Sequence, residues 1–287
     1  MPVQYRDMEQ ENIQWHPAFI EAIQMELEAY GDSLEFIPEF QLTTGPLRID
    51  CVVVKKARDV VIKKNIAAMF REVNLLEYKS PDDYISVEDF YKVYGYACLY
   101  ASLEKVPVTS LTISFVESRY PRSLLTYLKE KRGYKVEKTS PGIYTVRGDV
   151  IPIQVIDCRR LSAGENSWLK DLCNSLGPMD WQRIFGALQQ RQGKAARVKA
   201  WLDATTKANN DSLQEAIKMS SSSLTVEQIL EEAGFYARAE ERKSLKIAQN
   251  FIDLGYPLED IASATQLDLE KVKGLCREKA KEAHGVE

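Results

Sequence analysis

The sequence predicts an α+β protein, in which helices pack on a mixed β-sheet and an all-helical part follows. Stretches of helical and strand periodicity alternate as far as about residue 160, whereas only helical periodicity is found beyond residue 161. The chain has 287 residues, of which 45% are hydrophobic, and this is sufficient for a large core. We therefore expect a mixed α/β domain over residues 1–160 and a helical region over residues 161–287.

The first part of this domain reads as one helix followed by three strands. Apolar residues recur at helical spacing over residues 15–30, and Gly31 ends the pattern. A turn at residues 43–46 and a break at residues 80–83 separate segments that are rich in β-branched residues. The predicted strands are residues 34–42, 47–55 and 73–79.

The second part of the domain begins with a clear helix start. Ser86 has the chemistry of an N-cap, and Glu88 and Asp89 place acid in the first turn of a helix over residues 87–102. An apolar strand at residues 111–116 follows. The remaining predicted elements are a short helix at 121–131 and strands at 134–138, 143–147 and 150–156.

The composition excludes several classes of site. No apolar run approaches the roughly 20 residues that a membrane span needs, and the first residues lack the order of a signal peptide. The five cysteines are scattered without a CxxC pair, which favours a cytoplasmic protein without a zinc site. With only His16 and His284 available, any metal is expected to be a hard ion with oxygen ligands.

Two of the predicted strands carry charged residues on apolar faces. Asp50 shares a face with Val52, and Glu77 shares a face with Lys79, because successive side chains of a strand alternate between its two faces. If these strands are neighbours, two carboxylates and one ammonium converge. A divalent cation would relieve the repulsion between the carboxylates and activate a water for attack on a phosphate. The lysine would help to deprotonate that water or stabilise the phosphate.

The first helix offers a third acid. Of its glutamates, Glu26 lies nearest to the apolar stripe, so it alone is expected to lean towards the sheet. Glu21 and Glu28 lie farther round the helix and are expected to be solvated.

The ordered set of helix glutamate, strand Asp50, strand Glu77-Tyr78-Lys79 and following helix resembles the PD-(D/E)XK nuclease superfamily. The closer likeness is to its branch of recombination-promoting nucleases and transposase-like proteins, through PLRIDCVVVKK (residues 46–56) and NLLEYKSPDDYISVEDFYKVYGYACLY (residues 74–100). The likeness covers residues 13–116 and implies a restriction-endonuclease-like sheet. One departure is Ile49, which stands before Asp50 in place of the proline of the motif.

The resemblance also implies a role for each residue. Asp50 and Glu77 would ligate Mg²⁺ or Mn²⁺ together with the backbone carbonyl of Tyr78, and Lys79 would position or activate the water. Glu26 would hold a second metal ion or a water bound to it. The implied activity is endonucleolytic hydrolysis of DNA, linked to recombination or transposition.

A different interpretation remains open for the same residues. Asp50, Glu77 and Lys79 can instead form a cluster of ion pairs at the edge of the sheet, and such pairs are common and weakly stabilising. The chain would then be a non-catalytic nucleic-acid-binding or assembly protein built on a nuclease-like fold.

Candidate contacts to nucleic acid lie elsewhere in the chain. Lys92 and Tyr96 are one helical turn apart, and the acid-free stretch 183–201 contributes Arg191, Lys194 and Arg197. Half-exposed side chains and a solvated helix face are the alternatives, and the net charge of −4 does not favour a polyanion partner.

The end of the chain resembles a small helix-turn-helix tail. Residues 255–280 read as two helices with a turn near residues 265–268, which implies either DNA contact or a packing and oligomerising pair. Because residues 260–269 contain no lysine or arginine, the second helix begins without donors for DNA, and packing, including a homo-oligomer, is favoured.

Overall fold

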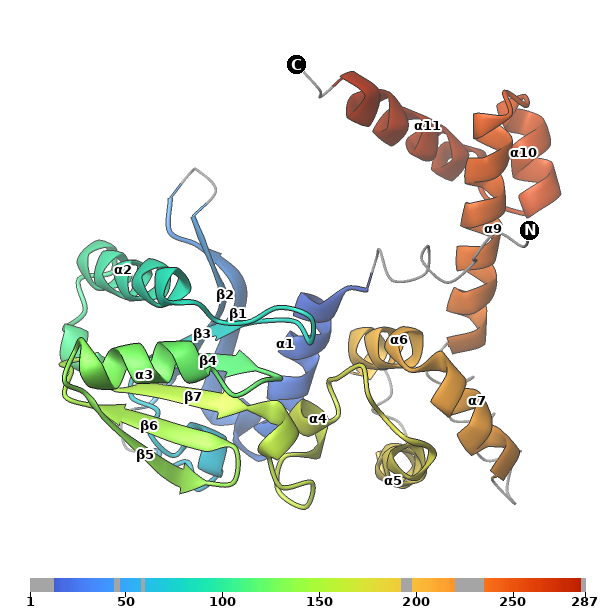
Figure 1. Ribbon diagram of the computed structural model, residues 1–287. Helices are drawn as coiled ribbons and strands as arrows, with labels where there is room; N and C mark the ends of the chain where they lie inside the picture. The colour runs from blue at the N-terminus through green and yellow to red at the C-terminus, as the bar shows by residue number, and fades with distance from the viewer. Residues whose placement is uncertain (1–12, 44–46, 58–59, 192–197, 220–234, 285–287) are drawn as a thin grey trace. The chain divides into compact units, whose positions relative to one another are not determined.

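The computed structural model describes residues 13–43, 47–57, 60–191, 198–219 and 235–284 (Figure 1). The chain divides into two compact units, Met1–Ser221 and Ser222–Glu287. The first unit contains one mixed sheet with helices on it, and the second is helical in its described residues. The expected α+β class with a helical C-terminal part is therefore confirmed. None of the described helices is long and apolar enough to cross a membrane.

The sheet has seven strands in the order β1-β2-β3-β4-β7-β6-β5. Its centre is parallel, because β3 pairs with β4 and β4 with β7 in the same direction, while β1, β2, β6 and β5 pair antiparallel at the two sides. The central strands are buried along their whole length, as expected for parallel strands covered on both faces. The bounds are β1 Leu34–Gln41, β2 Arg48–Lys55, β3 Val73–Tyr78, β4 Leu111–Glu117, β5 Lys135–Ser140, β6 Ile143–Arg147 and β7 Ile153–Asp157.

Two helices cover one face of the sheet, namely α2 (Val87–Leu103) and α3 (Arg122–Glu130) (Figure 1). Their buried residues, among them Phe90, Val93 and Leu125, join one core cluster with the strand residues of that face. Helix α2 starts where the sequence predicts: the Ser86 hydroxyl accepts a hydrogen bond from the Asp89 amide, and the Asp89 carboxylate accepts one from the Ser86 amide.

The opposite face is covered by α1 (Trp15–Glu26), whose Phe19 stacks on Tyr78 with ring centroids 4.6 Å apart. This helix is shorter than the predicted 15–30, because the chain tightens into a 3-10 helix at Glu28–Ser33.

The helices between residues 161 and 221 belong to the same compact unit as the sheet, and two of them, α4 and α6, pack on α1. The boundary expected near residue 160 therefore marks the end of the strands, while the contacts divide at Ser221. The expectation that Glu21 and Glu28 are solvated is wrong: Glu21 accepts a hydrogen bond from the Trp201 amide, and Glu28 pairs with Arg191 at 2.7 Å. The helices of this part are α4 Ser167–Lys170, α5 Pro178–Gln189, α6 Lys199–Ala208 and α7 Asn210–Met219.

The second unit contains α9 (Phe235–Asp253), α10 (Leu258–Thr265) and α11 (Leu269–His284). Its small core joins one residue of each helix, Ala248, Ile261 and Val272. Gln266 turns the chain between α10 and α11 in the left-handed conformation, close to the predicted turn. The two predicted helices of the tail therefore pack on a third helix that precedes them.

Candidate functional site

Asp50 and Glu77 lie opposite each other on neighbouring antiparallel strands. The register pairs Cys51 with Leu76, so the next position brings Asp50 of β2 against Glu77 of β3. Directly opposed residues have Cβ atoms roughly 5 Å apart. By strand alternation, Asp50 shares a face with Val52 and Glu77 shares a face with Leu75, and both of these apolar residues belong to the core cluster that includes α2. The Asp50 carboxylate turns towards His16 of α1. Its charge acts on Glu77, so the two carboxylates lie near each other.

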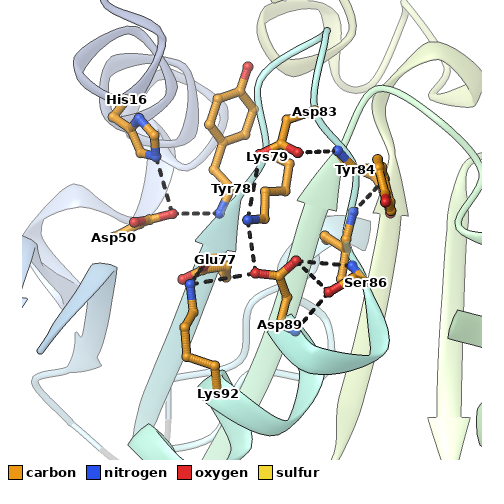
Figure 2. Close-up of polar contacts among 12 residues, drawn as sticks. His16, Asp50, Glu77, Tyr78, Lys79, Asp83, Tyr84, Ser86, Asp89 and Lys92 are labelled. Carbon is orange, nitrogen blue, oxygen red and sulfur yellow. Dashed lines mark hydrogen bonds and ion pairs between the residues drawn. The ribbon is translucent and has the colours of Figure 1, made fainter.

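The Asp50 carboxylate contacts two different elements (Figure 2). Its Oδ2 accepts a hydrogen bond of 2.8 Å from the backbone amide of Tyr78, and it lies 3.6 Å from Nε2 of His16 at the start of α1. The hydrogen bond and the negative charge of Asp50 raise the pKa of His16 against the opposing effect of its partial burial. Asp50 thus ties the end of β3 to α1 through one of its two oxygens.

Glu77 is almost fully buried and accepts a hydrogen bond from α2. Lys92 Nζ donates to Glu77 Oε1 at 2.7 Å (Figure 2). Burial and the charge of Asp50 raise the pKa of Glu77, although Lys92 and Lys79 act in the opposite direction. Such repulsion between adjacent carboxylates is what a divalent cation relieves.

Lys79 directly follows β3, and its backbone amide still bonds to the neighbouring strand β4 by donating to the Val116 carbonyl. Its ammonium lies 2.9 Å from Asp89 and 3.6 Å from Asp83 (Figure 2). Burial favours the neutral amine, but the hydrogen bond and charge of Asp89 outweigh it and raise the pKa of Lys79. Lys79 is therefore an ammonium at neutral pH, and this favours electrostatic stabilisation over general-base chemistry.

Asp89 is the residue that sequence reasoning missed as part of the site. The sequence indicates only an acid of the first turn of α2, yet Asp89 caps that helix and pairs with Lys79. Its Oδ1 also lies 3.7 Å from Nζ of Lys92. Its pKa is lowered despite burial, because Ser86 and Lys79 donate hydrogen bonds to it. The signal in the sequence was the spacing of Asp89 and Lys92, three residues apart on one helical face.

Glu26 lies at a different place from the other three predicted catalytic residues. Its buried carboxylate accepts hydrogen bonds from the amides of Trp168 and Leu169 at the start of α4 and pairs with Lys64 at 2.6 Å. Burial raises its pKa, and Lys64 and the two amides partly offset this effect. Glu26 does lean inward as predicted, but among the described residues its contacts join α1 to α4, and none reaches Asp50 or Glu77.

The oxygen atoms of Asp50, Glu77 and the Tyr78 carbonyl are of the kind that a hard divalent cation binds. Asp50 Oδ1 and Glu77 Oε2 have no hydrogen-bond partner in the described part of the chain. The Tyr78 amide points to β2, so its carbonyl points to the same side of the strand. No three His, Cys, Asp or Glu side chains among the described residues form a complete metal cage. Mg²⁺ does not require one, because it typically binds one or two carboxylates and keeps several waters.

The predicted contacts to nucleic acid fall into three groups. Lys92 lies beside Glu77, and Tyr96, also on α2, is half-buried against the core cluster. Arg191 is held by Glu28 and lies over the Trp168 ring at 5.4 Å. Lys194 and Arg197 lie outside the described residues.

A second pair of acids lies farther along the same face of the sheet. Glu117 and Asp157 end the parallel strands β4 and β7, pair in register and are both buried. Glu117 accepts one hydrogen bond from the Ile85 amide, and its Oε1 has no partner within the described ranges. Burial raises its pKa to about 8. Arg160 pairs with Asp157 at 3.2 Å, yet burial still raises the pKa of Asp157.

A cavity of about 500 Å³ lies away from these acids, between β6 and residues 65–71. Its charged lining residues include Arg71 and Arg147, which bind the Thr109 carbonyl and Glu137 respectively. Because its arginines are engaged by other groups of the protein, we assign no function to this cavity.

Comparison with models of known protein families, with curated proteins and with solved structures finds no match to this chain. The functional interpretation therefore depends on the geometry around Asp50, Glu77 and Lys79.

Proposed function

We propose that this protein is a divalent-cation-dependent endonuclease that hydrolyses DNA phosphodiester bonds. The observation that carries the proposal is the position of Asp50 and Glu77, opposed on adjacent strands with the Lys79 ammonium on the same face. The order α1, β1, β2, β3, α2, β4 agrees with the arrangement that the resemblance to PD-(D/E)XK nucleases implies. DNA as substrate, a role in recombination or transposition and a cytoplasmic location are parts of the proposal that rest on that resemblance and on composition.

Each residue has a defined task in this proposal. Asp50, Glu77 and the Tyr78 carbonyl would hold Mg²⁺ or Mn²⁺, which supplies an acidified water and neutralises charge on the scissile phosphate. Lys79, kept cationic by Asp89, stabilises the negative charge that develops on the phosphate oxygens. The hydrogen bond from the Tyr78 amide holds Asp50 in place without using its second oxygen.

The direct experiment is a plasmid-nicking assay on the full chain with Mg²⁺ or Mn²⁺ and with EDTA as the control. We expect nicking that EDTA abolishes and that Asp50→Asn and Lys79→Met remove. Lys129→Met, which removes an exposed charge from α3, is the matched control and should nick like the wild type. A wild-type protein that never cuts DNA with either ion would contradict the proposal.

A second candidate function is a non-catalytic nucleic-acid-binding or assembly protein. It is favoured by the ion pairs Lys92–Glu77 and Lys79–Asp89, which neutralise the cluster without any metal. In that case the substitutions would lower the melting temperature instead of removing an activity. Thermal unfolding of the same variants distinguishes the two functions.

A further inference from the structure

The Lys92 ammonium is bound to Glu77, one of the two carboxylates that would hold a cation. Glu77 has only 5% of its side chain exposed, and Lys92 Nζ contacts its Oε1 at 2.7 Å. Lys92 itself is 41% exposed, so its side chain approaches the buried carboxylate from solvent. The carboxylate is therefore neutralised by a side chain that comes from solvent.

A divalent cation and an ammonium compete for the same carboxylate. Two positive groups within a few ångströms of each other repel, and in a partly buried site this repulsion is weakly screened. Lys92 must therefore move from Glu77 when the cation binds. Its nearest alternative acceptor is Asp89 Oδ1 at 3.7 Å, but Lys79 already contacts that oxygen at 2.9 Å.

The displaced ammonium lacks a carboxylate of its own, because Asp89 is shared with Lys79. Lys92 is exposed and lies on the first turns of α2, next to the cluster where the scissile phosphate would bind. A backbone phosphate supplies the anion that the displaced ammonium needs. Cation binding would then prepare a phosphate contact, and phosphate binding would keep Lys92 away from Glu77.

We propose that Lys92 is a resident counter-ion of Glu77, which a divalent cation displaces and a nucleic-acid phosphate then accepts. The cation and the polyanion consequently bind cooperatively, and the cation binds weakly when nucleic acid is absent. This inference rests on the proposed function, because it assigns a cation to Glu77. It differs from the ordinary interpretation of Lys92 as a permanent ion pair in predicting that loss of the ammonium strengthens cation binding.

The test is a calorimetric titration of the full chain with Ca²⁺, a hard oxygen-preferring ion, alone and with a short DNA duplex. Lys92→Met keeps the length of the side chain and removes its charge, and Lys92→Gln is a second variant that keeps a donor. Both variants should bind Ca²⁺ alone at least about tenfold tighter than the wild type, because a charge this close changes affinities by roughly that factor. The control Lys129→Met should stay within about twofold, the scatter expected for a distant exposed charge.

The duplex should tighten Ca²⁺ binding to the wild type at least about fivefold, a typical lower bound for coupled sites. It should tighten binding to Lys92→Met markedly less. Folded variants that bind Ca²⁺ no more tightly than the wild type would overturn the inference, as would a chain that binds no Ca²⁺ in any form.

The outcome separates this inference from the nuclease proposal. If Asp50-dependent nicking occurs but the Lys92 variants bind Ca²⁺ unchanged, the inference alone fails. If the variants bind Ca²⁺ tightly through Asp50 while the wild type never cuts DNA, the inference stands and the nuclease proposal fails.

Discussion

Two pairs of carboxylates lie on one face of the same sheet, and their neighbours differ. Asp50 and Glu77 are flanked by the ammonium groups of Lys79 and Lys92 and by His16, and the half-exposed Lys92 connects them to solvent. Glu117 and Asp157 are buried, and one oxygen of Glu117 has no partner in the described part of the chain. The first pair has cationic groups beside Glu77, whereas in the second pair Arg160 pairs with Asp157 and Glu117 has no ion pair among the described residues.

This difference shows that spacing on a sheet does not by itself make a cation site. In-register acids occur twice, but burial holds Glu117 in its neutral form up to about pH 8, and a protonated carboxyl is a poor ligand for a metal ion. Burial and the charge of Asp50 also raise the pKa of Glu77, but Lys92 and Lys79 act in the opposite direction. These two lysines therefore distinguish the first pair from the second.

The largest expected effect is on activity at the first pair. Asp50→Asn should lower the rate of nicking by roughly a thousandfold, a loss typical of removing one charged group from an electrostatically organised site. Glu117→Gln, which replaces a neutral acid by a neutral amide of the same shape, should keep the wild-type rate. The comparison of the two pairs would be broken if both variants lost activity equally, as measured by initial rates on supercoiled plasmid.

The second prediction concerns the dependence of stability on pH. The pKa of Glu117 is about 8 in the folded protein and near 4.5 when unfolded, so between these values the folded state holds a proton that the unfolded state has released. Its contribution to stability is therefore complete below about pH 4.5 and falls as the pH rises to 8. Glu117→Gln removes this loss and should gain on the order of 2 kcal/mol over the wild type at pH 8.

Chemical denaturation at pH 5 and pH 8 measures this effect. Glu130→Gln, an exposed acid on α3, is the control and should show no such gain. An equal stability of Glu117→Gln and the wild type at both pH values would show that Glu117 is ionised, which would remove the distinction between the two pairs.

The third prediction concerns the helix start that carries Asp89. Ser86→Ala removes the side-chain acceptor for the Asp89 amide and should cost about 1 kcal/mol of stability. Because Asp89 also pairs with Lys79, a less well fixed Asp89 should also lower the nicking rate. Denaturant unfolding measures the stability, and initial rates on supercoiled plasmid measure the nicking. Ser123→Ala, at an exposed serine of α3, should leave the stability and the nicking rate unchanged.

The smallest effect is expected at Tyr78. Its hydroxyl is buried and has no partner among the residues that the structure describes, while its ring stacks on Phe19 and its backbone amide donates to Asp50. Tyr78→Phe keeps the ring and the backbone and removes only the unpaired hydroxyl, so stability should change by less than about 1 kcal/mol. A larger loss in thermal unfolding would reveal a partner for the hydroxyl, such as a buried water.

Much of the sheet could be predicted from the sequence because each strand and its breakers are local signals. The helix from Ser86 is a clear example, since its cap and first-turn acids stand in the sequence itself. The order of strands β4, β7 and β6 is not local, because it depends on which segments pair after the chain crosses the sheet. The packing of α4 and α6 on α1 depends on contacts more than 140 residues apart, which periodicity cannot reveal.

The candidate site divides in the same way. The alternation of side chains along a strand predicted that Glu77 and Lys79 share a face. The pairing of β2 with β3, which makes Asp50 their neighbour, was only a condition in the sequence analysis and is given by the structure. Lys92 was identified as a possible phosphate contact but not as the partner of Glu77. The position of Glu26 near the apolar stripe predicted that it belongs to the site. In the structure its carboxylate accepts a hydrogen bond from the Trp168 amide at the start of α4.

The sequence alone determined the α+β class and that Glu77 and Lys79 share one face of a strand, because both follow from short-range periodicity and alternation. The pairing of β2 with β3, which brings Asp50 to them, came from the structure. Only the tertiary structure decided which charges stand beside them. Ion pairs such as Lys92–Glu77 and Lys64–Glu26 join elements that lie far apart in the chain, and their partners are set by how helices pack on the sheet.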